Sequence, residues 1–411
     1  MWRKIKEELA FIRGNFLVLL LSYTIFNLSY ALSSPFESPF LEKLGASPFV
    51  IGALGSLGSF ILFLVRIPGS YIVDKHGRRQ IIVTMTYGVA LSNIFFILAP
   101  NWIFYMGGVI ATNICLIYQP ALEAIEADSL TPERRGVGYA AFRVLPFLPS
   151  IFSPLIAGML VSLYSVDPGM RMIYGIVLAF DLAAAILRHA FLKETLKNAK
   201  PFNLKEFKIA FKESLREILD SWKLMPKSLA FLLASTLMMA FTDPFFYRFG
   251  SLYALQVVGL TDVEWGAVIA INLATMLSLG LFLGKAVDVF GRKKALIVAH
   301  LIFTPATVFF TLSKSFSMLA MAYVFFAIAS VLFGSATSAL QADIVPKERR
   351  GRIFGSIGAL YILMGALGSL VGGFLYENVG STVPFWLCIP LDIIALLIVI
   401  FKVKEPEKRE A

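Results

Sequence analysis

The sequence predicts an all-α polytopic membrane protein, with twelve transmembrane helices in two six-helix bundles and both termini in the cytoplasm. Three observations lead to this fold class. The 411-residue chain is 58% hydrophobic and only 16% charged, against roughly half and a quarter in an average soluble domain. Apolar runs of about 20 residues, the length that crosses a bilayer, recur through the sequence, and their continuity argues against a transmembrane β-barrel. A short charged hairpin between two such runs occurs twice, which indicates a duplicated chain.

The distribution of positive charge predicts the orientation. The net charge is +10, and 30 of the 37 Lys and Arg fall in segments that are cytoplasmic if the N-terminus is inside. Only Lys43, Arg171 and Lys314 lie in the opposite loops. Cytoplasmic loops are enriched in Lys and Arg, so we expect both termini inside and an even number of spans. The excess charge then needs no nucleic-acid partner. The basic segment 1–15 precedes a full-length apolar run, which predicts a retained first helix and not a removed signal peptide.

Six helices are expected in the first half of the chain. Pro35 and Pro39 interrupt the first of them, and short turns or charged loops join the others. The expected spans are 16–44, 48–73, 80–98, 102–127, 137–164 and 172–192.

The second half repeats this plan at a near-constant spacing. Gly52 and Gly158 recur as Gly266 and Gly373. Such a register predicts two bundles of the same topology, related by an axis along the membrane normal. We therefore expect bundles at 1–192 and 229–411. The polar segment 193–228 between them has helical apolar periodicity, which predicts an amphipathic linker helix on the cytoplasmic leaflet.

Each hairpin combines an aspartate, a turn glycine and a basic cluster. The first contains Asp74, Gly77, Arg78 and Arg79, and the second contains Gly284, Asp288, Gly291 and Arg292. A second charged turn runs from Asp128 to Gly136 and recurs from Asp343 to Gly351, with Pro, Glu and two Arg before the glycine.

These paired motifs resemble the loops of the major facilitator superfamily, whose pattern is Gly-x-x-x-Asp-(Arg/Lys)-x-Gly-Arg-(Arg/Lys). The resemblance covers nearly the whole chain and implies a transporter of that fold, closest in pattern to the drug/proton antiporter-like members. Two departures separate this chain from those antiporters. Gly108 stands where they usually carry an arginine, and the Gly-Pro-rich signature of their helix five is degraded at Pro154 to Gly158.

The charged hairpins are expected to act as a cytoplasmic gate. Arginine enters lipid only at high cost, so Arg78 and Arg79 anchor the first hairpin at the membrane surface. Asp74 and Asp128 lie at the same depth and can pair with these arginines. Pairs that form in one state and break in another would latch two rocking bundles. Asp288, Arg292 and Asp343 are the second-half counterparts, and the alternative is that all these charges are topology anchors.

Ionisable residues inside the apolar runs are candidates for the transport cavity, because an isolated charge in lipid is costly. Helix four carries Gln119, Glu123 and Glu126 on one face, and Glu123 is the expected proton carrier. The other candidates are Glu37 between its two prolines, Arg143 and Arg248 as counter-ions, and Asp243 beside Pro244. The alternatives place Glu126 in the gate and Glu37 at the extracellular rim.

The function expected from these residues is secondary-active transport of a small organic solute by alternating access, coupled to protons, with export of amphiphilic compounds favoured. Uptake of a sugar or organic acid and a sensor built on a transporter scaffold are the alternatives. No catalytic or phosphate-binding motif accompanies these residues, so we expect no enzyme activity, cofactor or metal. We expect a monomer in the plasma membrane.

Overall fold

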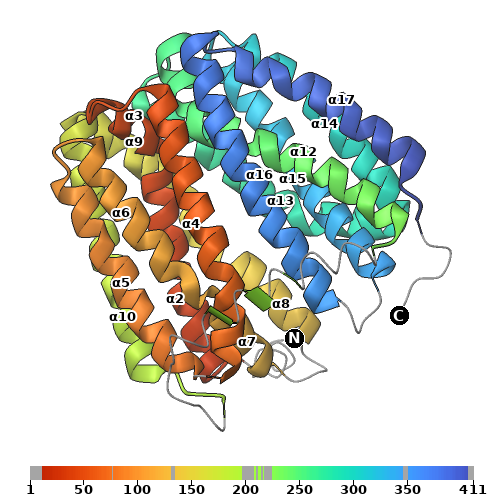
Figure 1. Cartoon of the computed structure of the whole chain (residues 1–411). Coiled ribbons are helices and arrows are strands. Elements are labelled where there is room, and N and C mark those ends of the chain that lie inside the picture. The colour runs from red at the N-terminus through yellow and green to blue at the C-terminus, as the bar shows by residue number, and fades with distance from the viewer. Residues whose placement is uncertain are drawn as a thin grey trace, which may run out of the picture.

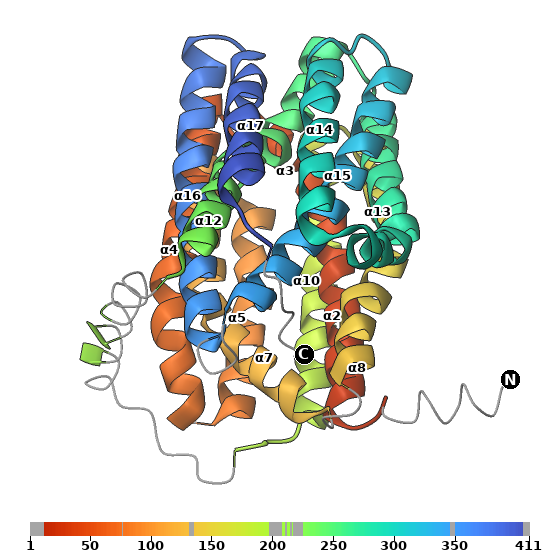
Figure 2. The same ribbon diagram turned by 90° about the vertical axis from the view of Figure 1, so that its right-hand side faces the viewer.

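The computed structural model describes residues 12–75, 77–130, 135–196, 208–209, 212–213, 216, 225–345 and 350–405. Within these residues, twelve helices are long and apolar enough to cross a membrane. Figures 1 and 2 show these helices standing alongside one another. The predicted all-α membrane fold with twelve spans is confirmed. The predicted linker helix at 193–228 lies largely outside the described residues.

The first half of the structure extends from α2 to α10, and a 3₁₀ segment interrupts three of its six described spans. The first span is α2 (Asn15–Ser33), a 3₁₀ turn (Ser34–Phe36) and α3 (Glu37–Lys43). The next two are α4 (Pro48–Lys75) and α5 (Arg78–Leu98). The fourth is α6 (Trp102–Cys115), a 3₁₀ turn (Leu116–Tyr118) and α7 (Gln119–Asp128). The fifth is α8 (Arg135–Val144), a 3₁₀ segment (Leu145–Phe152) and α9 (Ser153–Tyr164), and the sixth is α10 (Val166–Phe191).

The second half extends from α12 to α17, and its helices are longer and mostly unbroken. They are α12 (Lys227–Leu252) with a π-helical turn (Tyr253–Val258), α13 (Asp262–Phe290), α14 (Arg292–Thr311), α15 (Phe316–Ile344), α16 (Arg350–Asn378) and α17 (Val383–Lys402).

Two helix boundaries correct the sequence expectations. The fifth span is not one helix, because Pro146 and Pro149 in the 3₁₀ segment and Pro154 at the start of α9 each lack a backbone N–H donor,. The sixth span begins at Val166 and not at 172, with Asp167 in its first turn, where a negative charge suits the helix dipole,. The irregular backbone expected beside Glu37 is present as the 3₁₀ turn before it.

Glycine pairs bring the two halves together at one end. A Cβ placed on Gly52 of α4 would lie 3.0 Å from the Cα of Gly373 on α16. A Cβ placed on Gly266 of α13 would lie 3.1 Å from the carbonyl carbon of Pro154 on α9, and Gly158 of α9 packs in the same way against Asp262. Small residues allow helices to approach this closely. Gly52 and Gly266 occupy equivalent positions in the two repeats, and so do Gly158 and Gly373. The two contacts are therefore related by the internal repeat.

We call this end the closed end, and the opposite end, where Gly77 and Gly291 lie, the hairpin end. In Figure 1 the helices of the two halves diverge toward the hairpin end.

The buried apolar clusters also differ between the closed end and the rest of each half. One buried cluster combines Phe36 and Phe40 of the first half with Phe249 and Phe385 of the second. Two further clusters each draw on one half alone. Apolar packing therefore joins the halves at the closed end.

Local chemistry explains the hairpin turns. Gly77 has φ 86° and Gly291 has φ 98°, a region in which a side chain is strained. Each glycine immediately precedes the first residue of the next helix, Arg78 of α5 or Arg292 of α14.

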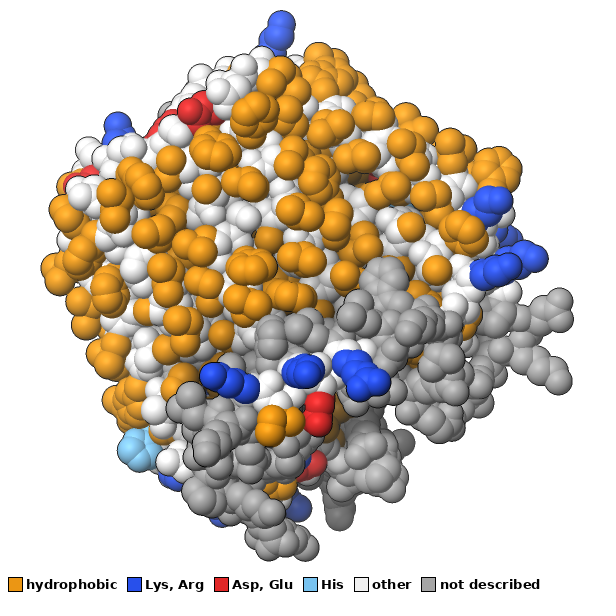
Figure 3. Space-filling model, in the orientation of Figure 1, with side chains coloured by type: hydrophobic (Ala, Val, Ile, Leu, Met, Phe, Trp, Pro, Cys, Tyr) orange, Lys and Arg blue, Asp and Glu red, His pale blue; other side chains and the backbone are white. Residues whose placement is uncertain are grey.

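The outer surface of the protein is apolar. In Figure 3 hydrophobic side chains cover most of the described part of the face, and most Lys and Arg lie toward its lower and right-hand margins. The chain is thus a multi-pass membrane protein.

Candidate functional site

Two adjoining cavities lie among the helices. The larger, about 550 Å³, is enclosed by α12 to α16 of the second half. The smaller, about 350 Å³, lies between the halves and is lined by residues of α2, α3 and the 3₁₀ segment of the fifth span as well as α12, α13 and α15. Phe246, Tyr247, Asn272 and Tyr323 line both, so the cavities share a wall. Volumes of this size suit small organic molecules.

An ion pair joins the two halves at the smaller cavity. Nη1 of Arg248 on α12 lies 3.0 Å from Oε1 of Glu37 on α3, and the side chains are 19% and 28% exposed. The hydroxyl of Tyr105 also donates to Glu37, at 3.3 Å, and lies 2.8 Å from the hydroxyl of Tyr174. The Arg248 side chain crosses α4 at Gly55, where a Cβ would lie 2.9 Å from its Nε. Glu37 and Arg248, both expected at the cavity, therefore line it as partners.

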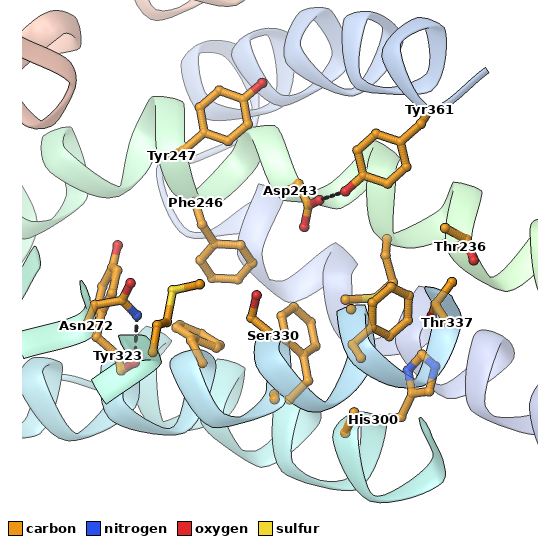
Figure 4. Close-up of a pocket in the computed structure, with 18 of the residues that line it drawn as sticks. Thr236, Asp243, Phe246, Tyr247, Asn272, His300, Tyr323, Ser330, Thr337 and Tyr361 are labelled. Atoms are coloured by element: carbon orange, nitrogen blue, oxygen red, sulfur yellow. Dashed lines mark hydrogen bonds between the residues drawn. The ribbon is translucent and has the colours of Figure 1, made fainter. Parts of the chain in front are cut away.

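Asp243 lines the larger cavity, and its partner is a tyrosine instead of an arginine. Its carboxylate accepts a hydrogen bond from the hydroxyl of Tyr361 on α16, and Figure 4 shows the two side chains meeting at the cavity wall. The aromatic side chains that line this cavity are Phe246, Tyr247, Phe303, Tyr323, Phe326, Phe333 and Tyr361. None of the described residues that line it is Lys or Arg. The cavity is therefore an aromatic chamber containing a carboxylate.

The polar stripe on helix four lines neither of these two cavities. Nη2 of Arg66 on α4 lies 3.0 Å from Oε1 of Glu123, whose side chain is 61% exposed, and Nη1 of Arg66 donates to Gln119 at 3.5 Å. Glu126 is half-buried, and Arg143 is close enough to interact with it electrostatically. Arg248, also expected as a counter-ion, pairs with Glu37 in this conformation and not with these carboxylates. Sequence reasoning gave no role to Arg66, although an arginine inside an apolar run was itself a signal.

The first charged hairpin is tied to its own half. Arg78 pairs with Asp128 and also donates to the hydroxyl of Thr195 at 3.0 Å. Arg79 donates to the carbonyl oxygens of Leu192 and His189 at 2.7 and 2.6 Å. The expected pairing of Arg78 with Asp128 is present. The side chain of Asp74 lies outside the described residues.

The second hairpin repeats the arrangement. Arg292 pairs with Asp343, Asp288 is exposed, and a Cβ on Gly284 would meet nothing within 4 Å. Both ion pairs lie within one half: Arg78 with Asp128 in the first, Arg292 with Asp343 in the second. In this conformation neither pair joins the halves, so a latch between bundles stays a prediction.

Known proteins resemble this chain in sequence and in fold. The family model of the Major Facilitator Superfamily matches residues 19–280 and 249–411. The vacuolar membrane amino acid uptake transporter fnx2 of Schizosaccharomyces pombe is 30% identical over 149 residues, which is 36% of this chain and 25% of fnx2. The quinolone resistance protein NorA of Staphylococcus aureus is 26% identical over 154 residues, 38% of this chain and 39% of NorA. The matched regions thus span a quarter to two-fifths of these relatives.

Among solved structures, the human organic anion transporter MFSD10 superposes with a TM-score of 0.69. The alignment covers 94% of this chain and 98% of MFSD10 at 19% identity, which shows a shared fold. The family model spans nearly the whole chain, and the twelve spans and central cavities agree with it. This chain therefore belongs to the Major Facilitator Superfamily.

Proposed function

We propose that this protein moves small amphiphilic organic compounds out of the cell by alternating access, driven by protons across the plasma membrane. The observation that carries the proposal is the ion pair between Glu37 and Arg248. It is partly buried, borders the cavity between the halves, and has one partner on each half. A bond in this position links the charge state of Glu37 to the relative placement of the halves.

The coupling follows from electrostatics. An ionised Glu37 attracts Arg248, and the low dielectric of a partly buried site strengthens that attraction. When Glu37 takes a proton from cavity water, its charge is lost and the attraction falls to that of a neutral hydrogen bond. Proton binding would then favour parting of the halves at the closed end, and deprotonation would favour the conformation described above. A protein that has two such states can exchange protons for solute.

The proposed substrate class rests on the larger cavity. Aromatic side chains surround it, Asp243 supplies a carboxylate, and its lining contains no Lys or Arg within the part of the chain that the structure describes. Aromatic faces and a carboxylate favour an apolar molecule that carries positive charge. NorA is named for quinolone resistance, which supports an organic compound as the solute. The name of fnx2 describes uptake of amino acids, which keeps proton-coupled uptake as the alternative direction and an organic acid as the alternative solute.

The test is proton movement in proteoliposomes loaded with a pH-sensitive dye. Amphiphilic cations, sugars and carboxylates would be added one at a time under an imposed pH gradient, to wild type and to Glu37→Gln and Glu123→Gln. We expect an amphiphilic cation to drive proton flux in the wild type and the flux to fall at least tenfold in Glu37→Gln.

A matched control is Glu42→Gln, on the same short helix. Glu42 accepts a hydrogen bond from Gln256 at 2.6 Å, and a glutamine can keep an amide–amide bond there. We expect this variant to retain coupled flux. Flux that persists in Glu37→Gln but not in Glu123→Gln would move the proton site to helix four. Substrate binding without flux in the wild type would favour a sensor.

A further inference from the structure

Each half of the protein buries an aspartate on its last helix, at repeat-related positions. Asp181 on α10 and Asp392 on α17 are 3% and 2% exposed. Asp181 accepts hydrogen bonds from Ser29 at 2.9 Å and from the side-chain amide of Asn93 at 3.0 Å. A side-chain amide and a hydroxyl do not gain a proton at physiological pH, so neither partner of Asp181 supplies a second titratable group.

The second-half site contains an imidazole instead. Nδ1 of His300 lies 2.5 Å from Oδ1 of Asp392, and Thr304 donates to the other carboxylate oxygen at 2.6 Å. Nε2 of His300 lies 3.4 Å from the hydroxyl of Ser235 on α12, and the ring packs edge-on against Phe333. The bond to Asp392 assigns the proton on Nδ1, because the carboxylate accepts. That leaves Nε2 as the nitrogen that can gain or lose a proton.

Both protonation states of His300 are satisfied in this setting. A neutral ring accepts at Nε2 from the Ser235 hydroxyl, and a protonated ring donates to the same oxygen, because a hydroxyl can do either. In both states Nδ1–H donates to Asp392. A purely structural histidine needs only one of these arrangements. The pair also becomes electrically neutral when His300 is protonated, which lowers the cost of burying Asp392.

His300 borders the larger cavity. It lies near Thr236 and Thr337 in Figure 4, while Asn272 and Tyr323 lie at the opposite end. Its side chain lines the cavity but has no exposed surface in this conformation, so a bound proton would be shielded from water. Movement of α12 or α15, which carry Ser235 and Phe333, would open the way to it.

The charged and titratable groups around this site are few. Asp392 and Cys388 lie on α17, Asp243 on α12, and Tyr361 on α16. The cavity-lining residues of α13, α14 and α15 include no Asp, Glu, Lys or Arg. Among the described residues that line this cavity, His300 is therefore the one that can become cationic, and a proton on it would repel a cationic solute held at Asp243.

We propose that His300 and Asp392 form a second proton-binding site of this transporter, occluded in this conformation and opening on the cavity within the second half. A proton passes from cavity water to Nε2 of His300, Asp392 stabilises the imidazolium, and release returns the proton to water. The coupling part of this inference rests on the proposed function. The site itself does not, because protonation can be measured without a substrate.

The chain has three histidines, His76, His189 and His300, so two replacements leave a single imidazole. Protein with His76→Asn and His189→Asn, labelled with ¹⁵N-histidine and held in lipid nanodiscs, would be titrated by NMR from pH 5 to 9. We expect Nε2 to change protonation state in this range while Nδ1 stays protonated. Adding Asp392→Asn removes the carboxylate beside the ring and should change the titration curve. A ring that stays in one state from pH 5 to 9 overturns the proposal.

A second measurement uses the proton-to-substrate ratio with an amphiphilic cation that the proteoliposome assay shows to be transported. We expect His300→Gln to carry about one proton fewer per substrate, and His189→Gln, whose ring contacts Tyr87 near the surface, to match the wild type. A His300→Gln ratio equal to the wild type overturns the coupling part of the inference even if the ring titrates. A ring that titrates with no coupled flux in any variant contradicts the proposed function and leaves the proton site in place.

Discussion

The close approach of α4 and α16 at Gly52 gives a prediction whose size follows from the geometry. In Gly52→Ala the new Cβ would overlap the carbonyl oxygen of Ser369 and would lie 3.0 Å from Cα of Gly373. Unstrained carbon contacts are about 3.5–4.0 Å, so the helices would have to part by roughly 0.5–1 Å. Overpacking of this kind costs about 1–3 kcal/mol. Because the clash exists only where the halves touch, that cost shifts the conformational equilibrium away from this state by roughly 5- to 150-fold.

The assay is a distance distribution between two spin labels at the closed end. Lys43 at the end of α3 and Asn378 at the end of α16 are both exposed, and Cys115 and Cys388 would first be replaced by alanine. We expect Gly52→Ala to add or enlarge a longer-distance population in lipid nanodiscs.

The matched control is Gly280→Ala on α13, where a Cβ would meet nothing within 4 Å. This variant should reproduce the wild-type distribution. Gly266 is the position equivalent to Gly52 in the second repeat and lies at the contact with α9, so Gly266→Ala should behave like Gly52→Ala. If Gly52→Ala and Gly280→Ala give the same distribution, then the glycine contact does not hold the halves together.

Two further predictions concern stability. In a double-mutant cycle of Glu37→Gln and Arg248→Gln, thermal unfolding in detergent should show a favourable coupling of about 1–3 kcal/mol; a coupling below about 0.5 kcal/mol would mean that the pair is solvated like a surface ion pair. Partial burial alone would raise the pKa of the Glu194 carboxyl, but backbone N–H groups of Arg79, Thr195 and Leu196 hold that pKa below its ordinary value of 4.5. Its stabilising contribution is therefore complete above pH 4.5 and is lost as the pH falls through the lowered value. The difference in melting temperature between wild type and Glu194→Gln should shrink below pH 4.5. A difference that grows below pH 4.5 would contradict the lowered pKa of Glu194.

The sequence alone determined the features that depend on local chemistry. Twelve apolar runs give twelve spans, because each helix satisfies its own backbone in lipid. The hairpin glycines Gly77 and Gly291 adopt the positive φ that their turns require. The pairing of Arg78 with Asp128 was also predictable, since both residues had to lie at one membrane surface. The break in the fifth span could have been read from Pro146 and Pro149, each of which removes a donor from the helix.

Only the tertiary structure decided which distant residues meet. Glu37 and Arg248 both appeared among the cavity candidates, yet nothing in the sequence made them partners. Arg66 and His300 had no assigned role until folding placed them beside Glu123 and Asp392. The physical reason is that an ion pair across helices depends on how each helix is rotated about its axis and on how the two halves lean together. Those quantities are fixed by packing over the whole bundle, and the local pattern of residues does not contain them.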